Sequence, residues 1–229
     1  QTATLLMLAL LGTLWLHQRR RLGTWVVGLA VMLLSWGIVM TQSRTAWLEL
    51  AMLLCGLIWL RKRADLRVSP RTVFAIGGTF LLFFLAWPSV SDALYSPAGR
   101  TFEEQAGAGT RPVHWASLLD AVVRQPWFGY GWNQVAVAQA NVVTDHETMG
   151  EMLHHSHNLV LDLLVWNGVP LGALFAGVIA WWVASRGVRL GSADSAFAWL
   201  AIVVILVHSL LEYPFAYLYF LLPFGLWGG

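Results

Sequence analysis

Residues 22–40 read LGTWVVGLAVMLLSWGIVM, a run of 19 residues without a charged side chain. An α-helix needs roughly 20 apolar residues to cross the hydrocarbon core of a bilayer. The other apolar runs occupy residues 2–16 (a partial run), 45–60, 71–89, about 168–185, 195–212 and 214–229. These runs are continuous instead of alternating with period two, so they predict transmembrane helices.

The composition supports an all-α, polytopic transmembrane helical bundle. Apolar residues make up 58% of the chain and charged residues 11%, against about 25% charged residues in a soluble domain. A water-soluble globule is therefore excluded, and the single cysteine, Cys55, excludes an internal disulfide scaffold. Because the chain lacks an initiator methionine and begins and ends in apolar runs, we expect it to be part of a longer membrane protein.

Basic residues gather in alternate connecting segments. If every run crosses once, the positive-inside rule makes their side cytoplasmic. The opposite side then carries the turn at 41–44, a loop at about 90–156 and the corner at 212–214. Ten of the 14 Lys and Arg residues lie on the basic side: Arg19, Arg20, Arg21, Arg61, Lys62, Arg63, Arg67, Arg71, Arg186 and Arg189.

The long outer loop contains a helical pattern. Its polar face is expected to carry His114, Ser117, Asp120 and Arg124, and Pro126 ends the helix. We therefore predict a short amphipathic helix lying on the outer membrane surface. The apolar stripe has helical spacing and consists of Trp115, Leu118, Leu119, Val122 and Val123.

Two arginines on the outer side are candidates for anion binding. Arg44 lies between two spans in TQSRT, where basic residues are otherwise scarce. It is either an anion-binding residue that faces a cavity or an interfacial arginine whose charge reaches the headgroups. Arg111 directly precedes the amphipathic helix, and alone it would be a surface charge.

Histidines concentrate in the same loop, in the cluster HSHN at 155–158 and its neighbour His154. A histidine is a suitable general base, because its unperturbed pKa of about 6.5 lets the neutral ring accept a proton near neutrality. A zinc site is the alternative, and it would need a further ligand such as Glu151 or His146.

The residues after His157 predict a short helix at about 155–166, a break at 167–170 and then a span. The i, i+4 spacing of Asp162 from Asn158 allows a role in supporting the site, but we expect Asp162 to be a solvated carboxylate. Near the end of the chain, His208 and Glu212 have i, i+4 spacing and share one helix face. They are either functional residues or a structural pair that joins two helices.

These motifs together resemble the bacterial O-antigen ligase and polymerase superfamily. The sequences WNGVPLG at 166–172 and HSLLEYP at 208–214 favour its protein O-oligosaccharyltransferase branch, the PglL-type pilin glycosylation ligases. The resemblance extends from Arg44 to Pro223. The other motifs that carry it are SRTA at 43–46, Arg111 followed by Trp115, PWFGYGW at 126–132, and HSHN at 155–158 with Gly168 after it.

The resemblance implies an inverting transferase in the bacterial inner membrane, with its active site on the periplasmic face. It would move a glycan from undecaprenyl pyrophosphate to a Ser or Thr hydroxyl of a periplasmic protein such as pilin. Arg44 and Arg111 would stabilise the pyrophosphate, and His157 would act as the general base. The implied substrate-binding residues are Asn158, His208, Glu212 and Tyr213.

The implied organisation has three parts. Residues 1–89 and 168–229 would be transmembrane helices, and residues 90–167 a periplasmic loop that carries the catalytic motif. We expect no cofactor, metal or nucleic-acid partner. The alternatives are a lipopolysaccharide O-antigen ligase acting on lipid A core, an O-antigen polymerase, a membrane transporter, and a metal-dependent hydrolase built on the histidines.

Overall fold

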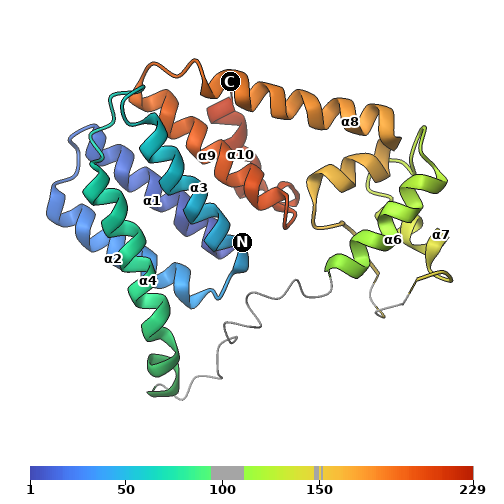
Figure 1. Ribbon diagram of the computed structural model, residues 1–229, viewed down its shortest axis with the longest axis horizontal. Coiled ribbons are helices and arrows are strands. Elements are labelled where there is room, and N and C mark those ends of the chain that lie inside the picture. Colours follow the sequence, from blue (N-terminus) through green and yellow to red (C-terminus); the bar gives the residue numbers. More distant parts are fainter. Residues whose placement is uncertain (94–110, 147–149, 151, 229) are drawn as a thin grey trace. The chain divides into compact units, whose positions relative to one another are not determined.

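The chain is helical throughout the part that the structure describes. The computed structural model describes residues 1–93, 111–146, 150 and 152–228, and every regular element in these ranges is a helix (Figure 1). The predicted all-α class is therefore confirmed for these residues. The chain divides into a first unit of Gln1–Gly107, Arg186–Val207 and Tyr219–Gly229, and a second unit of Ala108–Ser185 and His208–Leu218.

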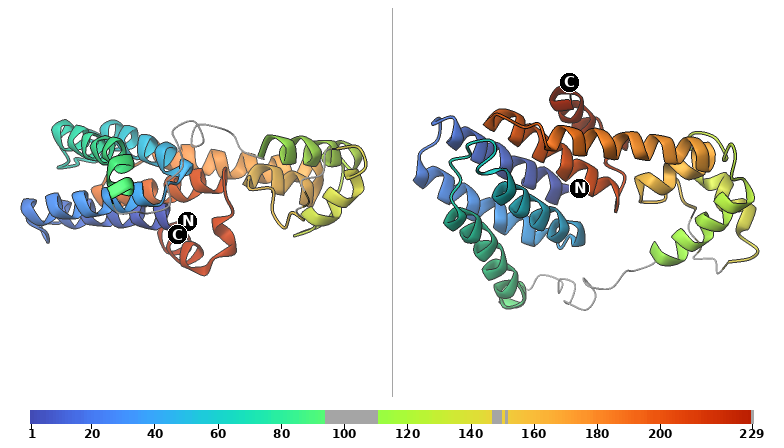
Figure 2. Two further views of the ribbon diagram at one scale, coloured as in Figure 1. Left: turned by 90° about the horizontal axis from the view of Figure 1, so that it is seen from below. Right: turned by 45° about the horizontal axis from the view of Figure 1, so that its top comes forward.

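The first unit is a bundle of apolar helices whose residue ranges are close to those of the predicted spans. In it, α1 packs against α2 and α3, and α4 packs against the same two helices (Figure 2). One core of buried side chains joins them and includes Met7, Leu53, Ile76 and Leu200. The unit contains α1 (Thr2–Gln18), α2 (Thr24–Met40), α3 (Arg44–Leu60), α4 (Pro70–Ala93) and most of α9 (Ala193–Ser209) and α10 (Leu218–Gly228).

Two helices in the described residues, α4 with 24 residues and α8 (Leu159–Gly187) with 29, are long and apolar enough to cross a membrane. The apolar helices α1, α2 and α9 have 17 residues each, or about 26 Å at 1.5 Å per residue. The final predicted span is shorter than expected. A 3₁₀ turn at Pro214–Ala216 and extended backbone at Tyr217 interrupt it, so that α10 has 11 residues.

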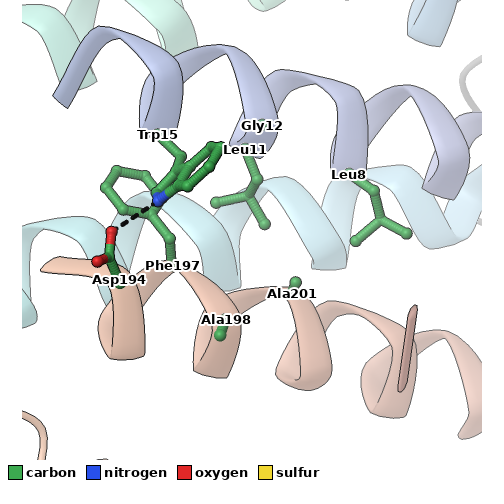
Figure 3. A pocket seen from close by; sticks show the side chains of 8 residues that line it. All are labelled: Leu8, Leu11, Gly12, Trp15, Asp194, Phe197, Ala198 and Ala201. Carbon is green, nitrogen blue, oxygen red and sulfur yellow. Dashed lines mark hydrogen bonds between the residues drawn. The ribbon is translucent and has the colours of Figure 1, made fainter. Parts of the chain in front are cut away.

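An apolar cavity of about 330 Å³ lies between α1 and α9 in the first unit (Figure 3). At one end, Trp15 Nε1 donates a hydrogen bond to Asp194 Oδ1 at 2.8 Å, and Arg19 pairs with the same carboxylate at 3.2 Å. The one carboxylate among the lining residues is thus paired with both Trp15 and Arg19. The lining residues are Leu8, Leu11, Gly12, Trp15, Asp194, Phe197, Ala198 and Ala201.

The second unit is built from α6 (Arg111–Arg124), α7 (Val135–Val142) and α8. Helices α6 and α7 pack against each other. The side chains at the centre of this unit are apolar, so hydrophobic burial holds these helices together. The buried core consists of Leu118, Ala121, Val122, Val135, Ala138, Val142, Leu153, Leu161 and Val165.

A break in α8 confirms the interruption predicted at 167–170. Gly168 has φ 74° and ψ 176°, which is not helical. The loop 126–131 fills the break: Tyr130 N–H donates to Val165 O at 2.8 Å, and Val169 N–H donates to Pro126 O at 2.6 Å. The backbone groups that the break leaves without helical partners are thus satisfied by the loop.

Helix α6 lies where the sequence predicts it, but the predicted division of its faces is wrong. Leu118 and Val122 are buried in the protein core beside α7, and His114 and Ser117 from the expected polar face are also buried. The helix packs against protein over a wider face than the apolar stripe indicates. Periodicity shows which side chains avoid water, but it does not distinguish a protein neighbour from lipid.

The loop 126–131 should depend on glycine at its closest approach to α8. Gly129 has φ 62°, and a Cβ there would lie 2.4 Å from Val165 O. We expect Gly129→Ala to lower the free energy of unfolding by at least about 1–3 kcal/mol, the usual cost of a sparsely populated backbone conformation. Thermal unfolding in detergent measures this loss. The control is Gly177→Ala in α8, where a Cβ meets nothing within 4 Å. Equal unfolding temperatures for the Gly129→Ala and Gly177→Ala proteins would contradict the expectation.

Candidate active site

The carboxylate of Glu212 joins two of the predicted site residues in the second unit. Glu212 Oε1 accepts a hydrogen bond from Arg111 Nη2 at 2.5 Å, and Oε2 lies 3.1 Å from His157 Nδ1. Arg111 is the first residue of α6, and Glu212 follows α9, 101 residues later. All three side chains are between 25% and 34% exposed, which leaves the site open to a ligand.

Electrostatics keeps this carboxylate ionised. Burial raises the pKa of Glu212, but the hydrogen bond from His157 and the charges of His157, Arg111 and His208 lower it by more, so the net pKa lies below the ordinary value of 4.5. An ionised Glu212 accepts a hydrogen bond from the Nδ1–H group of His157. In the neutral tautomer set by this hydrogen bond, the free lone pair of His157 is on Nε2.

The backbone of His157 is held in an uncommon conformation. Its φ is 58°, in the left-handed region that non-glycine residues rarely adopt. On either side, Ser156 Oγ donates to Asn158 O at 2.8 Å, and Asn158 Oδ1 accepts from the N–H groups of Val160 and Leu161. The observed contacts of Asn158 therefore cap the start of α8, and its binding of substrate stays a prediction.

Asp162 supports the same loop from α8. Its side chain is buried, and its Oδ1 accepts a hydrogen bond from Ser156 N–H at 2.8 Å. Its Oδ2 lies 3.8 Å from His155 Nδ1. The sequence-based expectation of a solvated carboxylate was wrong. The alternative suggested by its spacing from Asn158, a supporting role, agrees with the contact to Ser156. Spacing alone does not show that the 155–158 loop folds back over the helix.

Aromatic rings pack around the histidines. The ring of Tyr213 stacks on His155 at 4.9 Å between centroids and meets His157 edge-on at the same distance. Burial lowers the pKa of His155 below its ordinary value of 6.5, which favours the neutral ring at pH 7. The hydrogen bond with Tyr217 and burial raise the pKa of Tyr213, so its hydroxyl stays protonated.

Comparison with known proteins gives two family matches. A family model described as O-antigen ligase matches residues 29–176, about two thirds of the chain. The chain belongs to the O-antigen ligase family. A second model, described as the C-terminal part of a virulence factor membrane-bound polymerase, matches residues 196–227. Arg44, Arg111 and His157 lie within the first match, and Glu212 within the second.

Two relatives from Acinetobacter baylyi are similar to nearly the whole chain. One is named a ComP-specific O-oligosaccharyltransferase, with 33% identity over 98% of this chain and 41% of its own length. The other is named a general O-oligosaccharyltransferase, with 32% identity over 97% of this chain and 40% of its own length. The chain thus spans about two fifths of these relatives. No solved structure gives a significant match.

The family assignment confirms the resemblance predicted from the motifs. The predicted class of enzyme, an O-antigen ligase-like glycosyltransferase, agrees with the names of the family and of both relatives. Six of the predicted site residues lie in the second unit: Arg111, His157, Asn158, His208, Glu212 and Tyr213.

Arg44 belongs to the first unit, where it begins α3 directly after Ser43. The turn before it passes through Gln42, which has φ 51°. The side chain of Arg44 is half-buried. Its proposed action on the same ligand as Arg111 stays a prediction.

His146, a possible ligand in the alternative zinc site, contacts an aspartate instead of the histidine cluster. His146 Nε2 lies 3.0 Å from Asp120 Oδ2, and Asp120 also accepts a hydrogen bond from Arg124. Glu151 lies outside the described residues. Within the described part of the chain, no three histidine, cysteine or acidic side chains converge as a metal site would require.

The half-buried His155 predicts acid sensitivity. Because its pKa is lowered in the folded protein, the unfolded chain binds more protons at this residue as the pH falls through about 6.5, and acid favours unfolding. His155→Phe keeps the ring that stacks on Tyr213 but removes the titration. We expect the variant to gain stability relative to the wild type between about pH 7.5 and about pH 5.5. Thermal unfolding across this range measures the difference, and a pH-independent difference would contradict the assignment.

Proposed function

We propose that this chain carries catalytic residues of an inverting oligosaccharyltransferase. The enzyme would move a glycan en bloc from undecaprenyl pyrophosphate to a Ser or Thr hydroxyl of a periplasmic protein such as pilin. The observation that carries the proposal is the contact of the Glu212 carboxylate with both Arg111 and His157, in a chain of the O-antigen ligase family.

His157 is the proposed general base. Its Nε2 accepts the proton of the acceptor hydroxyl while the hydroxyl oxygen attacks the anomeric carbon of the glycan. The bond from that carbon to the pyrophosphate oxygen breaks, and undecaprenyl pyrophosphate leaves with the electron pair. Glu212 fixes the tautomer of the ring through Nδ1 and stabilises the imidazolium that forms. A single displacement of this kind inverts the configuration of the sugar.

Arg111 and Arg44 are proposed to stabilise the leaving group. A guanidinium has five N–H donors, so Arg111 can hold Glu212 with Nη2 and still donate to a phosphate oxygen. Planar guanidinium groups bind phosphate bidentately and keep their charge at any physiological pH. They would act where negative charge develops during the reaction, which is usually the largest contribution of such sites.

The distribution of basic residues supports a periplasmic site. Arg111, His157 and Glu212 lie in segments that the positive-inside rule places opposite the basic turns. The protein would therefore lie in the bacterial inner membrane and meet a lipid-linked donor at the outer leaflet.

His157→Ala should reduce glycan transfer by about 10²–10⁴-fold, the usual contribution of general-base catalysis. Mass spectrometry of pilin measures the product after incubation with the purified longer protein that contains this chain and a lipid-linked glycan. Asn141→Ala, at an exposed position on α7, is the matched control and should keep wild-type transfer. Unchanged glycosylation by a folded His157→Ala protein would refute the assignment of the base.

Arg44→Lys tests the anion-binding proposal. An ammonium keeps the charge but cannot form the bidentate fork, so most transfer activity should be lost. Arg67→Lys, at an exposed position on the basic side, serves as the control and should remain active. Full activity of Arg44→Lys in the same assay would make Arg44 an interface anchor.

A second candidate function is O-antigen polymerisation, because residues 196–227 match a family described as a membrane-bound polymerase. The donor chemistry is the same, and only the acceptor differs. Elongated lipid-linked glycan without glycosylated pilin, in the same reconstituted reaction, would favour this candidate.

A further inference from the structure

Four apolar side chains form an exposed ridge on the second unit. Val123 is 73% exposed, Trp127 71% and Phe128 86%, and Leu119 at the start of the ridge is 50% exposed. We call Leu119, Val123, Trp127 and Phe128 the aromatic ridge. Large apolar side chains that stay exposed together mark a surface that meets another apolar phase.

Helical geometry places these residues in one row. Leu119 and Val123 are i, i+4 neighbours on α6 and share a face. The chain continues beyond α6 with the same hydrogen-bond spacing, because Gln125 N–H donates to Ala121 O and Gly129 N–H donates to Gln125 O. Trp127 and Phe128 lie in the turn that directly follows α6.

The ridge is fixed rigidly to α8. Pro126, directly before the two aromatic residues, accepts a hydrogen bond from Val169 N–H at 2.6 Å. The approach is so close that a Cβ on Gly168 would lie 2.5 Å from the carbonyl carbon of Trp127. Any surface that holds Trp127 and Phe128 consequently holds the break in α8 as well.

The exposed apolar surface continues from the ridge onto α8. Val169, beside Pro126, is 43% exposed. This helix is one of those long and apolar enough to cross a membrane, so its exposed apolar face fits contact with lipid chains. The exposed large apolar side chains beyond the break include Leu171, Leu174, Phe175, Val178 and Trp181.

The charged groups beside the ridge pair with one another. Arg124 pairs with Asp120 at 2.8 Å and with Asp145 at 2.5 Å. A polar, internally paired rim next to Trp and Phe side chains is typical of the headgroup level of a bilayer, where aromatic rings concentrate. Attraction to anionic lipid is not needed for such contact.

We propose that the aromatic ridge is immersed in the boundary between headgroups and acyl chains of the membrane leaflet nearest the second unit. Amphipathic segments of this kind insert by roughly 5–10 Å. Because residues 156–169 form one hydrogen-bonded piece, from the loop of His157 through α8 to the ridge, lipid contact sets the height of His157 above the hydrocarbon. This last consequence rests on the proposed function, whereas the lipid contact itself does not.

Fluorescence quenching tests the contact directly. Phe128→Cys is labelled with nitrobenzoxadiazole in the full-length protein, in a background without other reactive cysteines, and reconstituted in phosphatidylcholine vesicles. A nitroxide near the glycerol end of the acyl chain should reduce the emission more than one near the methyl end. Thr144→Cys, at an exposed position after α7, is the control, and its label should instead be quenched by aqueous iodide. Adding anionic lipid should leave both results unchanged.

Other results would overturn the proposal. Equal iodide quenching at the two positions would show that the ridge stays in water. Nitroxide quenching that appears only after a polyprenyl-linked donor is added would assign the ridge to the donor's lipid chain. If the label at position 128 is protected from iodide only when an acceptor protein is present, the ridge would be assigned to binding that protein. The measurement needs no glycan transfer, so its failure and that of the proposed function are distinguishable.

A transfer assay then tests the consequence for the site. Trp127→Ser combined with Phe128→Ser removes the two aromatic side chains of the ridge at exposed positions, so the fold should be kept. We expect the KM of this double variant for the membrane-borne donor to rise with little change in kcat. Replacing both residues with Leu instead should raise the KM less, because the apolar surface is kept. An unchanged KM would contradict the role of the ridge in setting the height of His157.

Discussion

The carboxylate of Glu212, held between Arg111 and His157, is the contact on which this account depends. It brings together the start of α6, the loop before α8 and the turn after α9. Burial alone would raise the pKa of Glu212, but the positive neighbours lower it. The same charge therefore joins three segments and defines which nitrogen of His157 would accept a proton in the proposed reaction.

The surrounding structure holds His157 in place. Its left-handed backbone costs about 1–3 kcal/mol, and it is maintained by Ser156, the capping oxygen of Asn158 and the buried carboxylate of Asp162. Below this loop, the break in α8 is filled by residues 126–131. The rigidity of the site thus comes from backbone hydrogen bonds as well as from side-chain packing.

Local sequence signals predicted the helices, the interruption at Gly168 and the motif that contains His157, because each depends on residues close together in the chain. They did not predict that Arg111 pairs with Glu212, 101 residues away, since tertiary contacts decide that pairing. They also failed for Asp162 and for the faces of α6. Both errors have one cause: the sequence shows which side chains are polar or apolar, but not which protein segment covers them.

A double-mutant cycle on glycan transfer tests the central contact most directly. If Glu212 acts by orienting His157, the loss of the carboxylate matters only while the ring is present. The rate with both Glu212→Gln and His157→Ala should then equal that of His157→Ala alone. The account would be contradicted if the two reductions in transfer rate multiply. The double variant would then be slower than His157→Ala by the same factor by which Glu212→Gln slows the wild type.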